Sequence, residues 1–251
     1  MRFLIAFICL MGGTLFAQTT QPANAPATTE KKINALHAND KAKAILEQKV
    51  AEEAKLKNEE KEKLDKLGIS MSEKNVLGGL KIGDKAPNFK GVDQNGNNVD
   101  LEEQLKEGEV VVIFYRGYWC ELCNKHLSNL QSQLSSITDK GAKVIAITTE
   151  SNEYAKKTSE KNQLSFSVIS DTDLSILSDY KVLYEVSESY QHIIHRHVKT
   201  PINEFNNSED SFLPIPATYV IDKKGKVSWV YYNVNYRERA SVEEITNALA
   251  K

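Results

Sequence analysis

Residues 109–123 read EVVVIFYRGYWCELC and carry the clearest fold signal in the sequence. Its first part, residues 109–115, is a continuous apolar and mostly β-branched run between Gly108 and Gly117. Such a run is typical of a strand buried on both faces, as in a sheet that helices cover on either side. Two cysteines follow directly after this strand. The stretch therefore predicts an α/β fold with a pair of thiols at a strand-to-helix turn.

The sequence around this stretch alternates between helix and strand patterns. Helical spacing or cap signals predict helices at 127–137, 151–162, 173–180, 186–198 and 241–249. Short apolar runs predict strands at 143–148, 166–169, 217–222 and 226–234, and the last two form a hairpin. A second hairpin signal lies within 88–101, and 203–214 is expected to be a polar loop. This alternation implies a central mixed, mainly parallel sheet flanked by helices.

Residues 1–17 predict a secretory signal peptide. A positive residue precedes an apolar stretch at 3–15, and cleavage is expected after Ala17. The alternative is a short uncleaved membrane anchor, although a spanning helix needs ~20 apolar residues. Cleavage would remove Cys9 and leave two cysteines in the mature chain. We therefore expect secretion across the inner membrane to the periplasm, with no stable membrane span after cleavage.

Residues 18–75 separate this signal from the folded domain. Thr, Pro, Ala and Asn dominate 18–29, a composition that favours a disordered tether. Lys, Glu and Ala dominate 30–67 without Pro or Gly, which favours a charged helical extension. A long coiled coil is the alternative, but the apolar residues do not keep a clean heptad. The expected order is signal peptide at 1–17, tether and helical segment at 18–75, and one α/β domain at 76–251.

The overall composition excludes several classes of protein. Lys plus Arg number 32 and Asp plus Glu number 34, which gives a formal net charge of −2. A nucleic-acid binder usually carries a basic excess, so we expect no nucleic-acid partner. Three cysteines are too few for a small scaffold held together by disulfides. The cysteines are therefore of interest for their chemistry.

Cys120 and Cys123 form a Cys-x-x-Cys motif at the start of a predicted helix. The first sulfur would lie beside free backbone N–H groups and the positive end of the helix dipole, which favours the reactive thiolate. The second sulfur, about one turn later, would attack a mixed disulfide or a sulfenic acid on the first. Cys120 is thus the expected nucleophile and Cys123 the resolving thiol, with Trp119 shielding the sulfur.

Two other interpretations of the cysteine pair stay open. One is half of a zinc site, completed by His126 or by histidines of the cluster His192, His195 and His197. A structural zinc site needs four nitrogen or sulfur ligands, and the mature chain has no second cysteine pair, so we expect no metal. The other interpretation is an inert structural disulfide, against which the strand-to-helix position argues.

Charged neighbours modify the expected reactivity. Arg116, at the end of the strand, would lower the pKa of the Cys120 thiol or hold a peroxide oxygen. Its alternative role is an ordinary surface salt bridge. Glu121 would oppose the thiolate by charge repulsion, and we expect its side chain to face solvent.

Five segments carry a resemblance to a known family. The two longest are VVIFYRGYWCELC at 111–123 and LPIPATYVIDKKGKV at 213–227; the others are 83–89, 160–166, and Asn235-Tyr236 with Arg239. From about Lys81 onward the chain resembles the thioredoxin-like superfamily and, more narrowly, the peroxiredoxin-like alkyl hydroperoxide reductase and thiol-specific antioxidant family. The resemblance implies a thioredoxin-like fold, a redox-active Cys120–Cys123 pair, Pro216 as a cis proline facing the sulfurs, and Arg239 near the thiolate.

The chain departs from this family at three positions. Typical peroxiredoxins have Pro seven residues and Thr or Ser three residues before the reactive cysteine, where this chain has Ile113 and Gly117. Relatives also tend to have Pro after the first cysteine, where this chain has Glu121. The hydroxyl that orients a peroxide is therefore missing, and the site is closer to that of a dithiol oxidoreductase.

Three functions follow from these observations. The first is an antioxidant thiol peroxidase that reduces hydroperoxides through Cys120 and Cys123 and is regenerated by a thioredoxin-like reductant. The second is a periplasmic thiol–disulfide oxidoreductase acting on protein cysteines, and the third is a non-catalytic binding module that uses the Lys/Glu-rich segment. None of these functions requires a metal or an organic cofactor.

Overall fold

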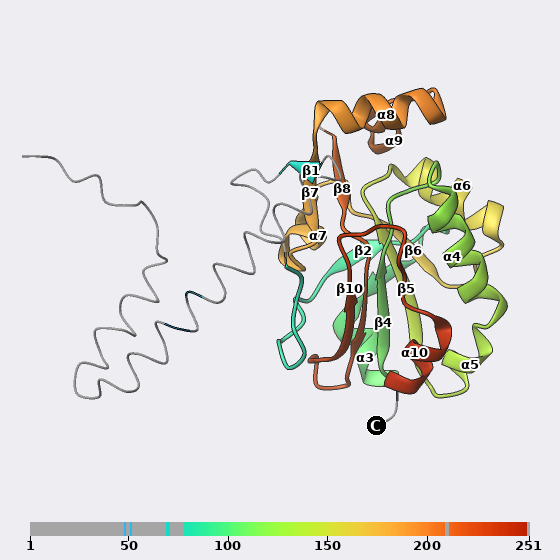
Figure 1. Ribbon diagram of the computed structural model, residues 1–251. Coiled ribbons are helices and arrows are strands. Elements are labelled where there is room, and N and C mark those ends of the chain that lie inside the picture. The colour runs from blue at the N-terminus through green and yellow to red at the C-terminus, as the bar shows by residue number, and fades with distance from the viewer. Residues whose placement is uncertain (1–47, 49–50, 52–68, 71–77, 209–210, 250–251) are drawn as a thin grey trace, which may run out of the picture. The chain divides into compact units, whose positions relative to one another are not determined.

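A computed structural model describes residues 48, 51, 69–70, 78–208 and 211–249 (Figure 1). The predicted signal peptide lies outside these residues, as does most of the predicted tether and helical segment at 18–75. The chain divides into two units, 1–56 and 57–251, and every element discussed below belongs to the second. Within the described part of the chain, no helix has the length and apolar character needed to cross a membrane.

The central sheet has five strands in the order β10-β9-β4-β5-β6. Their bounds are β4 Val110–Phe114, β5 Lys143–Thr148, β6 Ser167–Ser170, β9 Ala217–Ile221 and β10 Val227–Tyr232. β4, β5 and β6 run parallel, whereas β9 runs antiparallel to both β4 and β10. β10 therefore points the same way as β4, which confirms the predicted mixed, mainly parallel sheet with a hairpin at one side.

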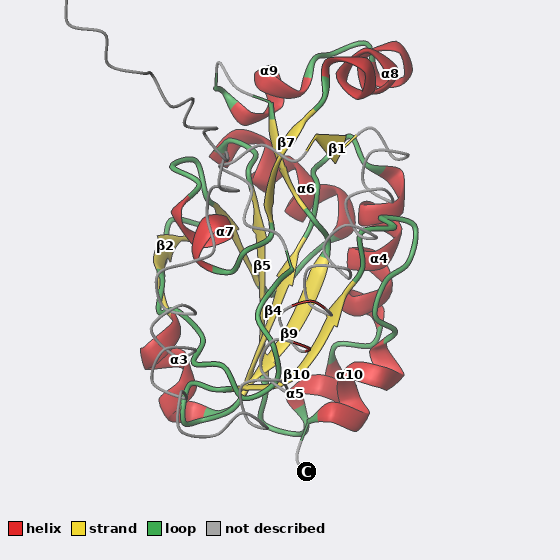
Figure 2. Cartoon of the chain, turned by 60° about the vertical axis from the view of Figure 1, so that its left-hand side comes forward, coloured by secondary structure: helices red, strands yellow, loops and turns green. Residues whose placement is uncertain are grey.

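Successive residues of β4 serve two separate cores, because side chains alternate between the faces of a sheet. Val111 and Ile113 pack into one core with α4 Glu121–Ser132, α5 Ser135–Thr138, α6 Asn152–Asn162 and α10 Val242–Ala248. Val112 and Phe114 pack into the other core with α3 Leu101–Glu107 and α7 Ser175–Asp179. Figure 2 shows α4 and α10 to the right of the central strands, and α3 and α7 to the left. Both cysteines belong to the first core.

Smaller sheets extend this framework. The hairpin predicted within 88–101 is present as β2 Lys90–Val92 and β3 Asn98–Asp100. A second small sheet has the order β1-β7-β8, with β1 Ile69–Ser70, β7 Leu183–Val186 and β8 Phe212–Pro214. Next to it lie α8 Glu188–Val198 and α9 Ile202–Asn206, close together in both views (Figures 1 and 2).

The expected polar loop at 203–214 is wrong, because this region holds the end of α9 and all of β8. Apolar residues spaced too irregularly to reveal a pattern are buried here, namely Ile202, Phe205 and Leu213. Ile202 and Leu213 form a third core with residues of β7 and α8. Burial of these side chains therefore decides the local structure that composition alone suggests to be a loop.

Candidate active site

Cys120 is the N-cap residue of α4 and lies at the end of the loop that follows β4. Its backbone N–H donates to the Gly117 carbonyl at 3.0 Å, and its Sγ accepts from the Cys123 N–H at 3.3 Å. The sulfur thus occupies the place of the side-chain oxygen that usually caps a helix. The free N–H groups and the dipole of this 12-residue helix stabilise negative charge at that point. The predicted position of Cys120 is confirmed.

Cys123 lies one turn into α4 and forms a disulfide with Cys120, with 5.2 Å between the two Cα atoms. Cys120 is 6% exposed and Cys123 only 1% exposed, so an incoming group reaches Cys120 more easily. Glu121, between them, is exposed as predicted. The geometry therefore gives two buried sulfurs within bonding distance, and the little exposure that the pair retains lies mainly on Cys120.

Arg116 is buried, with only 2% of its surface exposed, so the alternative of a surface salt bridge is wrong. Its guanidinium carbon lies 4.8 Å from the ring centre of Trp119, 5.5 Å from that of Tyr190 and 4.2 Å from that of Tyr236. Its Nη2 also donates to the Tyr190 hydroxyl at 3.0 Å. We call these three rings the aromatic cage. Aromatic faces attract a cation, so the cage holds the buried charge of Arg116 in place. Arg116 belongs to the loop 115–120 that joins β4 to α4, which we call the cysteine loop.

Arg239 approaches the disulfide from the segment between β10 and α10. Its Nη2 donates to Cys123 Sγ at 3.6 Å, and its Nη1 donates to the carbonyls of Tyr236 and Glu238. Burial, and after it the charge of Arg116, lower the pKa of Arg239 to about 10. Its guanidinium is therefore a cation at neutral pH. The resemblance implies an arginine near the thiolate, and the contact that the structure provides is with Cys123.

Glu150, at the carboxyl end of the strand β5, is a site residue that the sequence analysis missed. Its side chain is fully buried, and its Oε1 accepts the Tyr118 N–H at 2.6 Å. Burial raises the pKa of Glu150 to about 8. Gly117 lies against this carboxyl group: a Cβ there would be 2.5 Å from Glu150 Oε1 and 2.9 Å from Trp119 Nε1. Only a glycine leaves room for Glu150 beside the cysteine loop.

Sequence signals for these missed residues are weak. Glu150 follows the second buried strand of a mainly parallel sheet, and ligands of such sheets bind at the carboxyl ends of strands. That rule makes Glu150 a candidate in retrospect. No comparable rule identifies Tyr190 of the aromatic cage, which lies far from the cysteines in sequence. Tyr236 belongs to a segment that carries the family resemblance, but its contact with Arg116 was not predicted.

The predicted cis proline is wrong. No peptide bond of the described residues is cis, so the bond between Ile215 and Pro216 is trans. The trans form is the more stable by about 0.5–1 kcal/mol in an X-Pro bond. Here the chain passes from β8 to β9 through Ile215, whose N–H donates to the Val182 carbonyl at 2.7 Å. That Pro216 faces the sulfurs stays a prediction.

Of the histidines named for a zinc site, His126 lies on α4 and the other three lie on α8. His126 Nε2 lies 3.0 Å from the Ala240 carbonyl, and burial lowers the pKa of His126 to about 4. A carbonyl only accepts hydrogen bonds, so the neutral ring carries its proton on Nε2. His192, His195 and His197 are exposed on α8. Within the described ranges, no three or more His, Cys, Asp or Glu residues are grouped to hold a metal.

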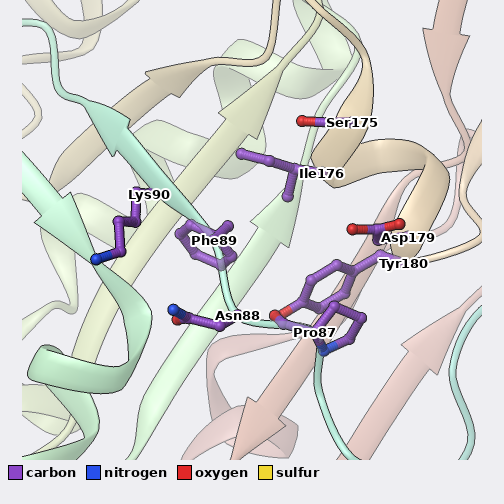
Figure 3. Close-up of a pocket in the computed structure, with 8 residues that line it drawn as sticks. All are labelled: Pro87, Asn88, Phe89, Lys90, Ser175, Ile176, Asp179 and Tyr180. Carbon is purple, nitrogen blue, oxygen red and sulfur yellow. The ribbon is translucent and has the colours of Figure 1, made fainter.

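A surface pocket lies on the opposite face of the sheet, between the β2 segment and α7. Figure 3 shows the residues that line it, Pro87, Asn88, Phe89, Lys90, Ser175, Ile176, Asp179 and Tyr180. The Tyr180 hydroxyl donates to the Pro87 carbonyl at 3.0 Å, and Lys90 pairs with Asp100 at 2.9 Å. Phe89, Ile176 and Tyr180 belong to the core that lacks the cysteines, so this pocket is separate from the disulfide.

Comparison with known proteins supports this description of the fold and shows the family. The AhpC/TSA family model matches residues 82–230. Thiol-disulfide oxidoreductase ResA of Bacillus cereus is 28% identical over 59% of this chain and 68% of its own length. Peroxiredoxin Bcp of Escherichia coli is 31% identical over 43% of this chain and 69% of its own length. The crystal structure of peroxidoxin BcpB from Mycobacterium tuberculosis superposes with a TM-score of 0.53 at 19% identity, covering 68% of this chain and 96% of that one, which shows the fold alone. The chain, with its cysteine pair at the start of α4, belongs to the AhpC/TSA family.

Proposed function

We propose that this protein reduces hydroperoxides through Cys120 and Cys123. The observation that supports the proposal is the pair of sulfurs, with Cys120 at a helix N-terminus and the more deeply buried Cys123 bonded to it. The Cys120 thiolate attacks the terminal peroxide oxygen, an S–O bond forms, and the O–O bond breaks. The alcohol or water leaves with a proton, and Cys120 becomes a sulfenic acid.

The second step forms the disulfide that the structure contains. The Cys123 thiolate attacks the sulfur of the Cys120 sulfenic acid, and the oxygen leaves as water after taking up a proton. A dithiol reductant then supplies two electrons: its thiolate attacks the disulfide, and its second thiol completes the exchange. We assign this role to a thioredoxin-like protein, and we place the reaction in the periplasm on the strength of the predicted signal peptide.

Thiol–disulfide exchange with protein cysteines is the second candidate function. It is favoured by Gly117, which stands where typical family members supply a hydroxyl and is packed against Glu150. Its backbone φ of 149° is a conformation that suits glycine, so the loop is not built for a threonine at this position. The ResA relatives, named thiol-disulfide oxidoreductases, support the same reading.

The two functions differ in the rate at which a peroxide oxidises Cys120. The reduced full-length protein is mixed with hydrogen peroxide, and oxidation is followed by tryptophan fluorescence, since Trp119 precedes the nucleophile. We expect oxidation faster than that of a free thiol at an equal thiolate fraction. A rate no faster than the free thiol would refute the peroxide reaction, and oxidation of a cysteine-containing client peptide would then be measured.

The assignment of the two sulfurs has its own test. Cys123→Ser should leave a sulfenic acid or a mixed disulfide on Cys120, visible by mass spectrometry as an adduct. Cys120→Ser is the matched control and should neither turn over nor trap that adduct. If the adduct appeared on Cys123 in Cys120→Ser instead, the roles would be reversed.

A further inference from the structure

We propose that Arg239 is a catalytic residue for Cys123: it stabilises the Cys123 thiolate, which leaves when a reductant opens the disulfide and attacks when the disulfide forms. The inference rests on the proposed redox cycle of the two cysteines, but it does not depend on which oxidant feeds that cycle. It also differs from the expectation that this arginine serves the nucleophile Cys120.

The two sulfurs have different electrostatic partners. Cys120 Sγ accepts a backbone N–H at 3.3 Å and lies at the start of the helix. Cys123 Sγ receives the Nη2–H of Arg239 at 3.6 Å. The helix terminus thus stabilises charge on the first sulfur, whereas a full cation is directed at the second.

Arg239 is held rigidly in this position. Its Nη1 donates to the carbonyls of Tyr236 and Glu238, so the guanidinium is fixed to its own chain segment. The next residue, Ala240, accepts the N–H of His126, which lies three residues after Cys123 on α4. The segment that carries the arginine is therefore attached to the helix that carries the resolving cysteine. The Arg239 side chain therefore loses little rotamer freedom when a thiolate forms on Cys123.

Among the described residues, no carboxylate forms an ion pair with Arg239. Its described hydrogen-bond acceptors are two carbonyl oxygens and Cys123 Sγ. Arg116 adds a buried cation nearby, and its charge contributes to lowering the pKa of Arg239. Within the described residues, the ion pairs join lysines to Asp or Glu and involve neither arginine. A thiolate on Cys123 would supply a negative charge beside the partly buried guanidinium, since a desolvated cation without an ion-pair partner is costly.

This arrangement assigns a direction to the reductive step. An incoming thiolate attacks Cys120 Sγ, because Cys120 is 6% exposed and Cys123 only 1% exposed. A new S–S bond forms to Cys120, the Cys120–Cys123 bond breaks, and its electron pair stays on Cys123 Sγ as a thiolate. A thiol that ionises more readily is the better leaving group in such an exchange. Arg239 therefore accelerates opening of the disulfide by stabilising the leaving sulfur.

The test compares Arg239→Met with the wild type in three measurements. In the Cys120→Ser background, thiolate absorbance should show that Cys123 ionises at a higher pH once the guanidinium is gone. In the intact dithiol protein, reduction of the disulfide by dithiothreitol should slow by about 3–10-fold, as the leaving group becomes more basic. In the Cys123→Ser background, alkylation of Cys120 should keep its rate within about 2-fold, since the helix terminus stabilises that thiolate.

Two further variants keep the result interpretable. Arg239→Gln retains an amide that can bind the Tyr236 or Glu238 carbonyl, so it serves if Arg239→Met does not fold. Lys125→Met removes an exposed positive charge from α4 two residues after Cys123 and should change none of the three measurements. The proposal is overturned if the arginine variants alter ionisation of Cys120 and leave that of Cys123 unchanged. The measurement with dithiothreitol contains no peroxide. If the protein did not react with peroxides, the proposed function would be refuted, but this test of Arg239 would stay valid.

Discussion

Glu150→Gln should remove a pH dependence from the stability of this protein. Glu150 is fully buried behind the cysteine loop, and burial raises its pKa to about 8 from an ordinary value of 4.5. Between these two values the folded protein holds a proton that the unfolded chain has lost. The free energy of unfolding of the wild type therefore falls as the pH rises through this window. Glutamine resembles the protonated acid in shape and does not titrate.

The size of the effect follows from the difference between the two pKa values. Each pH unit inside the window costs the folded state about 1.4 kcal/mol. Between about pH 5 and pH 8 the wild type should lose about 3 kcal/mol through Glu150, and no screening by solvent reduces this value because the side chain is 0% exposed. At about pH 5 we expect Glu150→Gln to match the wild type within about 1 kcal/mol, because Tyr118 still donates to the Oε1 atom.

Urea unfolding at several pH values, followed by tryptophan fluorescence on the oxidised protein, measures this difference. Asp171 also has its pKa raised, to about 7, by burial, but it is present in both proteins and cancels from the comparison. Glu153→Gln is the matched control, since Glu153 is exposed on α6 and its loss should add no pH dependence. A difference between Glu150→Gln and the wild type that stays constant from acidic to alkaline pH would show that Glu150 is ionised throughout, and the reasoning would fail.

Two other substitutions test the packing around the site. Gly117→Ala should lower the free energy of unfolding by about 1–3 kcal/mol, because its Cβ would meet the Glu150 carboxyl and the Trp119 indole in a backbone conformation that strains any side chain. Tyr190→Phe should also cost about 1–3 kcal/mol, because it deprives the buried Arg116 of the hydroxyl that accepts its hydrogen bond. Thermal and urea unfolding measure both.

Matched controls separate these effects from general damage. Gly96→Ala carries a similar backbone strain, with φ of 86°, but its Cβ would meet nothing within 4 Å. If it cost as much as Gly117→Ala, crowding by Glu150 would play no part. Tyr154→Phe removes a hydroxyl that makes no hydrogen bond within the described residues, so it should be close to neutral. An equal loss in Tyr154→Phe and Tyr190→Phe would contradict the role assigned to the Arg116 contact.

Features set by neighbouring residues were predictable. The apolar run at β4 correctly indicated a strand buried on both faces, and the cysteine motif correctly placed Cys120 at the start of a helix. The capping box between Ser241 and Glu244 is present at α10 as well. Each of these patterns acts within a few residues of the backbone, so the sequence contains all the information needed.

Features set by distant residues were not predictable in the same way. The segment at 203–214 looks polar, yet α9 and β8 form there because Phe205 and Leu213 find buried positions. The motif around Pro216 resembles one that contains a cis proline, but the peptide bond between Ile215 and Pro216 is trans. Both outcomes depend on what the rest of the protein places next to these residues.

An α/β fold with a redox-capable cysteine pair at a strand-to-helix turn was predictable from the amino-acid sequence. Which charges surround each sulfur became known only from the folded structure. Arg239 and Cys123 lie 116 residues apart in the chain, and Arg116 lies 74 residues from Tyr190. Their contacts arise from the register of the sheet and the packing of its helices. Electrostatic interactions depend on distance through space, and separation along the chain carries no information about that distance.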